Sequence, residues 1–131
     1  MTQHKDLELF AKNIRIQVLK AWATGLRPSG RRHVCRRCAG CTLWRRNERG
    51  SEEPSVEDRD YFVMSKGHAG PALYAALALK GYFPVEQLLT INTNGTRLPS
   101  HPDRNSTTGV DMSTGSLGQG MSTAIGIRHR K

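Results

Sequence analysis

The chain contains 131 residues, of which 37% are hydrophobic and 24% are charged. This length suits one domain with a modest core and excludes a multidomain machine. No apolar run approaches the roughly 18 residues that a membrane span requires, so we expect a soluble protein without a membrane partner. The polar N-terminus shows no signal or transit pattern, which favours a cytoplasmic chain.

The positive charge is concentrated in one segment. The net charge is +9, from 20 Lys and Arg against 11 Asp and Glu. Residues 21–50 hold eight arginines and a single acid, Glu48, together with all three cysteines and both tryptophans. The remainder of the chain is therefore nearly neutral. Two different compositions share one polypeptide.

The first twenty residues carry apolar side chains at spacings of three and four, with Lys, Arg and Gln between them. This period is that of a helix with one apolar face. The apolar positions are Leu7, Phe10, Ala11, Ile14, Val18 and Ala21. We predict an amphipathic helix over 1–20.

The basic segment at 21–55 has no sustained period of 2 or 3.6 and is predicted to be irregular. It offers three thiols and an imidazole within nine residues, a combination that can bind zinc, although all four crowd into one short stretch. Its arginines could contact phosphates and its tryptophans could stack on bases. A small zinc-binding or nucleic-acid-binding module at 27–46 is therefore the alternative interpretation. The four candidate zinc ligands are His33, Cys35, Cys38 and Cys41.

The second half of the chain alternates short ordered segments with loops. A buried strand is predicted at 60–64, and a helix at 71–80 with Gly81 as its C-terminal cap. A second short helix is predicted at 84–91. Residues 92–111 are rich in Asn, Thr, Gly, Pro and Ser, which predicts a long loop of the kind that carries function. The small residues from 113 onward lead into a last helix, whose N-terminus can approach a ligand closely.

Three blocks in this half carry a family resemblance. They are Arg-Asp-Tyr-Phe-Val-Met-Ser-Lys-Gly-His at 59–68, Leu-Pro-Ser-His-Pro-Asp at 98–103 and Ser-Thr-Gly-Ser-Leu-Gly-Gln-Gly at 113–120. Over residues 58–127 the chain resembles the N-terminal, thiamine-diphosphate-binding section of transketolases, in particular the form in which that section is a separate subunit. The three blocks occur in the family's order and at its spacing.

The resemblance implies an α/β fold, in which helices cover both faces of a mostly parallel sheet. This chain offers one clear strand. We therefore expect a helix-rich fragment of the family fold with an incomplete parallel sheet. Residues 1–131 form a single partial domain on this interpretation, with the amphipathic helix at 1–20, the irregular basic segment at 21–55 and a family-like core at 56–127.

The resemblance also implies roles for individual residues. His101 resembles the catalytic histidine that hydrogen-bonds substrate hydroxyls at the reacting centre, and His68 resembles the histidine beside the cofactor. The loop that starts at Gly115 resembles the loop whose backbone approaches the thiamine rings. The cofactor-binding residues implied are His68, Gly115, Ser116, Leu117 and Gly118.

Cofactor, substrates and partners follow from the same resemblance. Thiamine diphosphate with Mg²⁺ would serve the transfer of two-carbon ketol units between sugar phosphates, a reaction of the pentose phosphate pathway and carbohydrate metabolism. The family's Gly-Asp-Gly motif, which holds the metal ion, is not found in these residues, so no metal ligand is assigned. The glutamate that assists the cofactor belongs to the pyrimidine domain. We therefore expect a C-terminal transketolase subunit and a homodimer as partners, no nucleic acid, and no activity in the isolated chain.

The basic segment occupies the place of the family's Gly-His-x-Gly-Gly loop and the helix after it. Codons permitted for residues 33–47, read one base later, encode an amphipathic helix of family type, and the same shift extended back to residue 24 permits the missing loop. We therefore predict that residues 21–55 are translated out of frame. Resequencing that finds no family-like codons in either shifted frame would contradict this.

Overall fold

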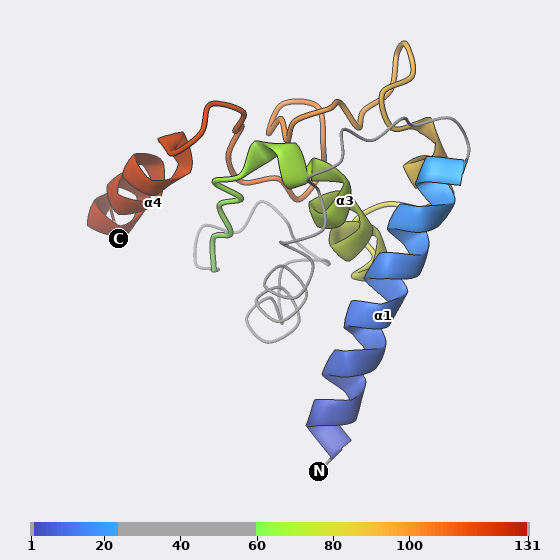
Figure 1. Ribbon diagram of the computed structural model, residues 1–131. Helices are drawn as coiled ribbons and strands as arrows, with labels where there is room; N and C mark the ends of the chain where they lie inside the picture. The colour runs from blue at the N-terminus through green and yellow to red at the C-terminus, as the bar shows by residue number, and fades with distance from the viewer. Residues whose placement is uncertain (1, 24–59, 131) are drawn as a thin grey trace.

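Two helices that are far apart in the sequence pack together and form the core (Figure 1). The computed structural model describes residues 2–23 and 60–130. Its elements are the α-helices α1 (Thr2–Ala23), α3 (Gly70–Leu79) and α4 (Gln119–Arg130), and the 3₁₀ helices η1 (Gly67–Ala69) and η2 (Val85–Thr90).

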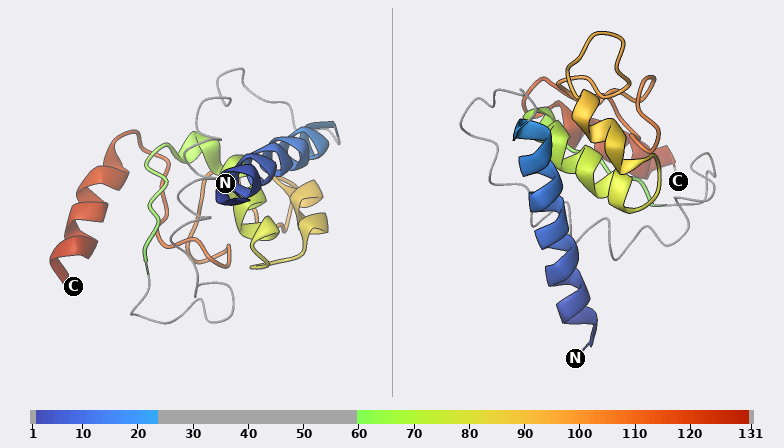
Figure 2. Two further views of the ribbon diagram at one scale, coloured as in Figure 1. Left: turned by 90° about the horizontal axis from the view of Figure 1, so that it is seen from below. Right: turned by 90° about the vertical axis from the view of Figure 1, so that its right-hand side faces the viewer.

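Helix α1 confirms the predicted amphipathic helix and continues it to Ala23. Its apolar face packs against α3 and η2, as the two views in Figure 2 also show. The side chains of Phe10, Ile14, Val18 and Ala21 are buried there. The predicted apolar face of α1 therefore packs against the rest of the molecule, because its burial removes apolar surface from water.

Helix α3 confirms the predicted helix at 71–80. Every residue from Gly70 to Ala78 is buried, because α1 and η2 both lie against it. Pro71 stands in its first turn, where the missing N–H costs nothing. At the other end Gly81 has φ +86° and its N–H donates to the Ala78 carbonyl, while the N–H of Tyr82 donates to that of Leu77. This is a Schellman cap, which requires a residue in the left-handed region.

The predicted strand at 60–64 is wrong: these residues have no regular secondary structure, and no strand is found in the described parts of the chain. A strand needs a neighbouring backbone, and here side chains take that place. The Phe62 N–H donates to Oδ2 of Asp111 over 2.6 Å, and the Met64 carbonyl accepts from Oγ1 of Thr114 over 2.8 Å. The segment is thus held by the loop at 111–114. The helix-rich character is as expected, whereas the described residues do not display the parallel sheet.

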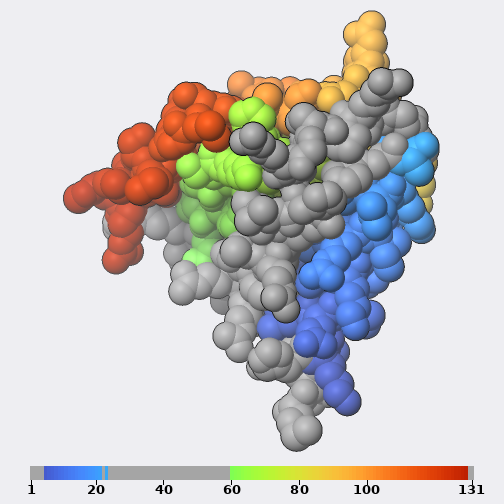
Figure 3. Space-filling view, in the orientation of Figure 1, coloured from blue at the N-terminus to red at the C-terminus, as the bar shows by residue number. Residues whose placement is uncertain are grey.

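The predicted helix at 84–91 is the 3₁₀ helix η2, which buries Leu88 against α1 and α3. The loop predicted at 92–111 is irregular throughout and continues to residue 118. It leads to α4, the last helix that the small-residue pattern predicts, which starts at Gln119. In Figure 3, α4 stands at one edge of the molecule and α1 at the opposite edge.

Two predictions concern residues beyond these ranges. The basic segment at 21–55 lies outside the described residues, except that residues 21–23 belong to α1. The candidate zinc and nucleic-acid ligands of that segment are therefore not described.

Within residues 2–23 and 60–130, no helix has the length and apolar character that a membrane crossing requires.

Candidate functional site

The two histidines singled out from the sequence lie against each other. His68 belongs to η1 and is exposed, and His101 lies in the long loop and is half-buried. Their ring centroids are 4.7 Å apart, and the ring planes meet at 87°. Residues from two separate sequence blocks therefore form one edge-to-face pair, of which His68 is the more exposed member.

The turn that carries His68 sits directly on the third sequence block. A Cβ atom on Gly67 would lie 2.8 Å from the carbonyl carbon and oxygen of Thr114 and 2.9 Å from the Cα of Gly115. No real side chain tolerates that separation. Gly67 is thus required by space, and it brings the His68 turn into backbone contact with the loop at 114–115.

The loop that carries His101 is held against α3. The Tyr74 hydroxyl donates to the Pro99 carbonyl over 2.9 Å, and burial raises the pKa of this phenol far above its ordinary value. The backbone of Gly70 also passes close to the loop: a Cβ there would lie 3.1 Å from the Ser100 carbonyl oxygen. The buried helix therefore serves as the platform on which His101 is placed.

The predicted cofactor loop begins at the histidine pair. A Cβ on Gly115 would lie 3.6 Å from two carbons of the His101 ring, so this residue borders the imidazole directly. The next residues, Ser116, Leu117 and Gly118, are exposed, and Leu117 is 73% exposed. Gly118 has φ +90° with open space where a side chain would stand. The loop thus presents backbone rather than packed side chains beside His101.

Asp103 closes the loop between His101 and Gly115. Its carboxylate accepts from the hydroxyls of Ser106 over 2.5 Å and Ser113 over 2.8 Å, and from the N–H of Asn105 over 3.2 Å. These hydrogen bonds, that of Ser106 foremost, lower the pKa of Asp103. A lowered carboxyl pKa stabilises the folded state above the group's ordinary pKa, and the contribution is lost as the pH falls. The sequence placed Asp103 in a family block but indicated no such structural role.

The described residues contain no group of three or more His, Cys, Asp or Glu side chains placed to hold a metal ion. The Cys-rich set predicted as the alternative ligand cluster lies outside them.

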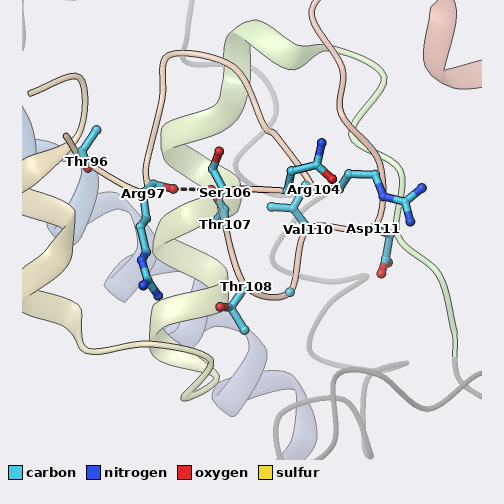
Figure 4. A pocket seen from close by; sticks show the side chains of 10 residues that line it. Thr96, Arg97, Arg104, Ser106, Thr107, Thr108, Val110 and Asp111 are labelled. Atoms are coloured by element: carbon cyan, nitrogen blue, oxygen red, sulfur yellow. Dashed lines mark hydrogen bonds between the residues drawn. The ribbon is translucent and has the colours of Figure 1, made fainter. Parts of the chain in front are cut away.

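A separate hollow of about 630 Å³ is lined by residues 96–97 and 104–111 and by none of the predicted site residues. Figure 4 shows the side chains of Arg97 and Arg104 on opposite sides of it. Because the two guanidinium groups do not converge, the hollow lacks a shared anion-binding centre. We place the candidate site at the histidine pair, where three sequence blocks meet.

Comparison with known proteins bears on the meaning of this convergence. Residues 32–131 match the family model described as transketolase, thiamine diphosphate binding domain. The chain belongs to this family. The match extends over all three of the sequence blocks that carry the resemblance.

Curated relatives agree with the assignment. The chain is 65% identical over 74 residues to the 6-deoxy-6-sulfo-D-fructose transketolase subunit SqwG of Clostridium sp. (strain MSTE9). The aligned region covers 56% of this chain and 27% of that subunit. It is 42% identical over 87 residues to transketolase 2 of Xanthobacter flavus, covering 65% of this chain and 13% of that enzyme. Transketolase 2 of Escherichia coli (strain K12) is 42% identical over 76 residues, covering 57% of this chain and 11% of that enzyme.

The chain therefore spans about a quarter of the length of the transketolase subunit and about an eighth of the full-length transketolases that it matches. The comparisons give no support to the alternative of a zinc-binding or nucleic-acid-binding module at 27–46. The transketolase family instead matches through most of that segment.

Proposed function

We propose that this chain supplies the thiamine-diphosphate-binding part of a transketolase-like enzyme that transfers two-carbon ketol units between sugar phosphates. The observation that carries the proposal is the contact between His68 and His101 beside Gly115. Each residue comes from a different block of the family resemblance, and folding brings the three together.

The geometry of the loop at 115–118 fits a flat cofactor. When bound, thiamine diphosphate supplies a nucleophilic carbon and an electron sink. Gly115 and Gly118 have no side chains that would block a ligand, and residues 116–118 are exposed to solvent. We assign His68, Gly115, Ser116, Leu117 and Gly118 to cofactor binding.

His101 is the residue that we assign to the substrate. An imidazole can donate and accept hydrogen bonds near neutral pH, which suits the recognition of sugar hydroxyls and proton movement at the reacting carbon. The half-buried His101 ring is confined between His68 and Gly115. Confinement restricts its orientation before any substrate binds, which lowers the entropic cost of binding.

Other parts of the enzyme remain to be supplied. We propose that Mg²⁺ accompanies the diphosphate, held by a Gly-Asp-Gly motif that does not occur in these 131 residues. The glutamate that assists the cofactor would come from a C-terminal transketolase subunit, in a homodimeric assembly in the cytoplasm. The isolated chain is therefore expected to be inactive and to bind the cofactor weakly and in a salt-dependent manner.

A coupled ketol-transfer assay tests this proposal. The 131-residue chain is assayed with thiamine diphosphate and Mg²⁺, alone and with the remaining parts of a transketolase, which carry the Gly-Asp-Gly motif and the C-terminal subunit, and the cofactor is titrated by calorimetry. The substrate panel includes sugar phosphates and 6-deoxy-6-sulfo-D-fructose, after which the Clostridium relative is named. We expect turnover only in the mixture.

Two variants locate the activity. His101→Asn should abolish turnover in the mixture, whereas His129→Asn, which changes an exposed histidine of α4, should leave it unaltered. Turnover by the isolated chain that disappears in His101→Ala would contradict the expected inactivity. Equal turnover by His101→Asn and the wild type would contradict the role of His101.

A further inference from the structure

Thr114 connects the three segments that form the candidate site. Its hydroxyl donates to the Met64 carbonyl over 2.8 Å, and its backbone N–H donates to the Pro102 carbonyl over 3.0 Å. It directly precedes Gly115 in the chain. Thr114 is only 6% exposed, so both hydrogen bonds are shielded from water. A buried polar group that loses such a hydrogen bond finds no water molecule to replace its partner.

Both histidines are linked to Thr114 over short lengths of backbone. Pro102 directly follows His101. Met64 lies four residues before His68. Two backbone hydrogen bonds stabilise the turn that joins them: the Ser65 N–H donates to the Val63 carbonyl over 3.1 Å, and the Ala69 N–H donates to the Lys66 carbonyl over 2.9 Å. A shift of Thr114 would therefore move the His68 turn relative to His101.

The side chain of Thr114 suits this position. A β-branched residue has few rotamers available, so the hydroxyl is held toward Met64 with little loss of entropy. The Gly67 backbone lies close to the Thr114 carbonyl, so Thr114 is packed against the His68 turn through its backbone as well. Serine would retain the hydroxyl with more rotational freedom, and valine would retain the shape without the donor.

We propose that Thr114 is a positioning residue, which sets the relative placement of His68, His101 and the loop at 115–118. The placement of the two rings follows from the contacts above, and only the ligand rests on the proposed function. Thr114 itself is buried and is not expected to touch the cofactor or the substrate.

The test compares Thr114→Val and Thr114→Ser with Thr107→Val. Thr107 is the matched control because it is 3% exposed and its hydroxyl also donates to a backbone carbonyl, that of Arg97, over 2.5 Å. The Arg97 carbonyl lies outside the three site segments, and the other partner of the Thr107 side chain, Tyr74, reaches the His101 loop only at Pro99. For each variant of the full chain, the histidine-ring signals are recorded in ¹H–¹³C NMR spectra and the melting temperature is measured.

We expect Thr114→Val to displace the ring signals of His68 and His101, and Thr114→Ser to restore their wild-type positions. Thr107→Val should lower the melting temperature by a similar amount and displace the two ring signals less than Thr114→Val does. If Thr114→Val moves the ring signals no more than Thr107→Val does, the proposal is wrong. If Thr114→Val does not fold, Thr114→Ser decides: ring signals that differ from those of the wild type overturn the proposal.

Cofactor titration separates this inference from the proposed function. Loss of the positioning hydrogen bond should weaken thiamine diphosphate binding by at most about tenfold, the equivalent of one hydrogen bond, because Thr114 acts on the cofactor only through the site segments. A wild-type chain that binds no cofactor, alone or with its partner subunit, would count against the proposed function, while the NMR comparison would still decide the role of Thr114.

Discussion

Helices α3 and α4 are similar in length and both contain small and apolar residues, yet they differ in burial. In α3 every residue from Gly70 to Ala78 is buried. In α4 the side chains of Met121 and Ile125 are 69% and 58% exposed, and Leu117 before it is 73% exposed. Among the described elements, α1, η1 and η2 contact α3, whereas none of the helices contacts α4. Helix α3 is also the more apolar of the two, since α4 carries Arg128, His129 and Arg130, so burial follows both from composition and from the partners that each helix has.

The contrast has a consequence for stability. Burial stabilises a helix by removing apolar area from water, and a helix without partners depends on its own propensity. A helix of 12 residues is marginal on that basis. We expect α3 to be part of the cooperative unit and α4 to unfold at lower free energy.

The largest effect is expected for truncation of the core. Leu77→Ala should reduce the free energy of unfolding by about 3 kcal/mol, because Leu77 is 1% exposed and its removal leaves a cavity. Ile125→Ala, the same kind of truncation on α4, should change it by less than about 0.5 kcal/mol. Urea denaturation of both variants provides the measurement. Equal losses would show that α4 belongs to the core.

A smaller effect is expected where α4 meets the site. A Cβ on Gly120 would lie 2.5 Å from the Cα of Ser65, so Gly120→Ala must push the start of α4 away from the His68 turn. Overpacking of this kind costs about 1–3 kcal/mol. Hydrogen exchange should show loss of protection in the first turn of α4.

Gly126→Ala is the control in the same helix, since no atom lies within 4 Å of a Cβ there. It should stabilise α4 by about 0.5–1 kcal/mol, because glycine is a poor helix former. The first turn of α4 contacts Ser65, whereas a Cβ at Gly126 would contact nothing. If Gly126→Ala loses protection from exchange, or if Gly120→Ala loses no protection, this distinction within α4 is wrong.

The smallest effect is expected for Tyr74→Phe, which removes the hydrogen bond from α3 to the Pro99 carbonyl and should cost about 1 kcal/mol. The pKa of Tyr74 is raised by burial, so the unfolded chain releases the phenolic proton at a lower pH than the folded chain. Wild-type stability should therefore decline above about pH 10, and less steeply in Tyr74→Phe. Parallel declines in urea titrations at pH 8 and 10.5 would contradict the buried phenol.

Prediction from sequence succeeded where the signal is periodic and local. The apolar spacing from Leu7 to Ala21 predicted α1 and the face that it buries, and Pro71 and Gly81 marked the ends of α3. It failed at 60–64, where a short apolar run was predicted to be a strand. Such a run does not show whether its backbone groups will meet another strand or, as here, the side chains of Asp111 and Thr114.

The candidate site divides in the same way. The family blocks identified His68, His101 and the loop from Gly115, because their residue types and order carry the resemblance. The sequence could not indicate that the two rings lie 4.7 Å apart or that Thr114 hydrogen-bonds to both neighbouring segments. Those partners are separated by up to 50 residues in the chain, and no local pattern reports such a distance.

The sequence by itself determined the helical segments and the membership of the transketolase family, and it singled out the candidate site residues. Helix period, capping residues and short motifs are local properties, and they are readable without a fold. Only the tertiary structure decided which elements bury each apolar face, which side chains take the place of the expected strand partner and how closely the histidines approach. These outcomes depend on close packing between distant segments, where space excludes all but a few arrangements.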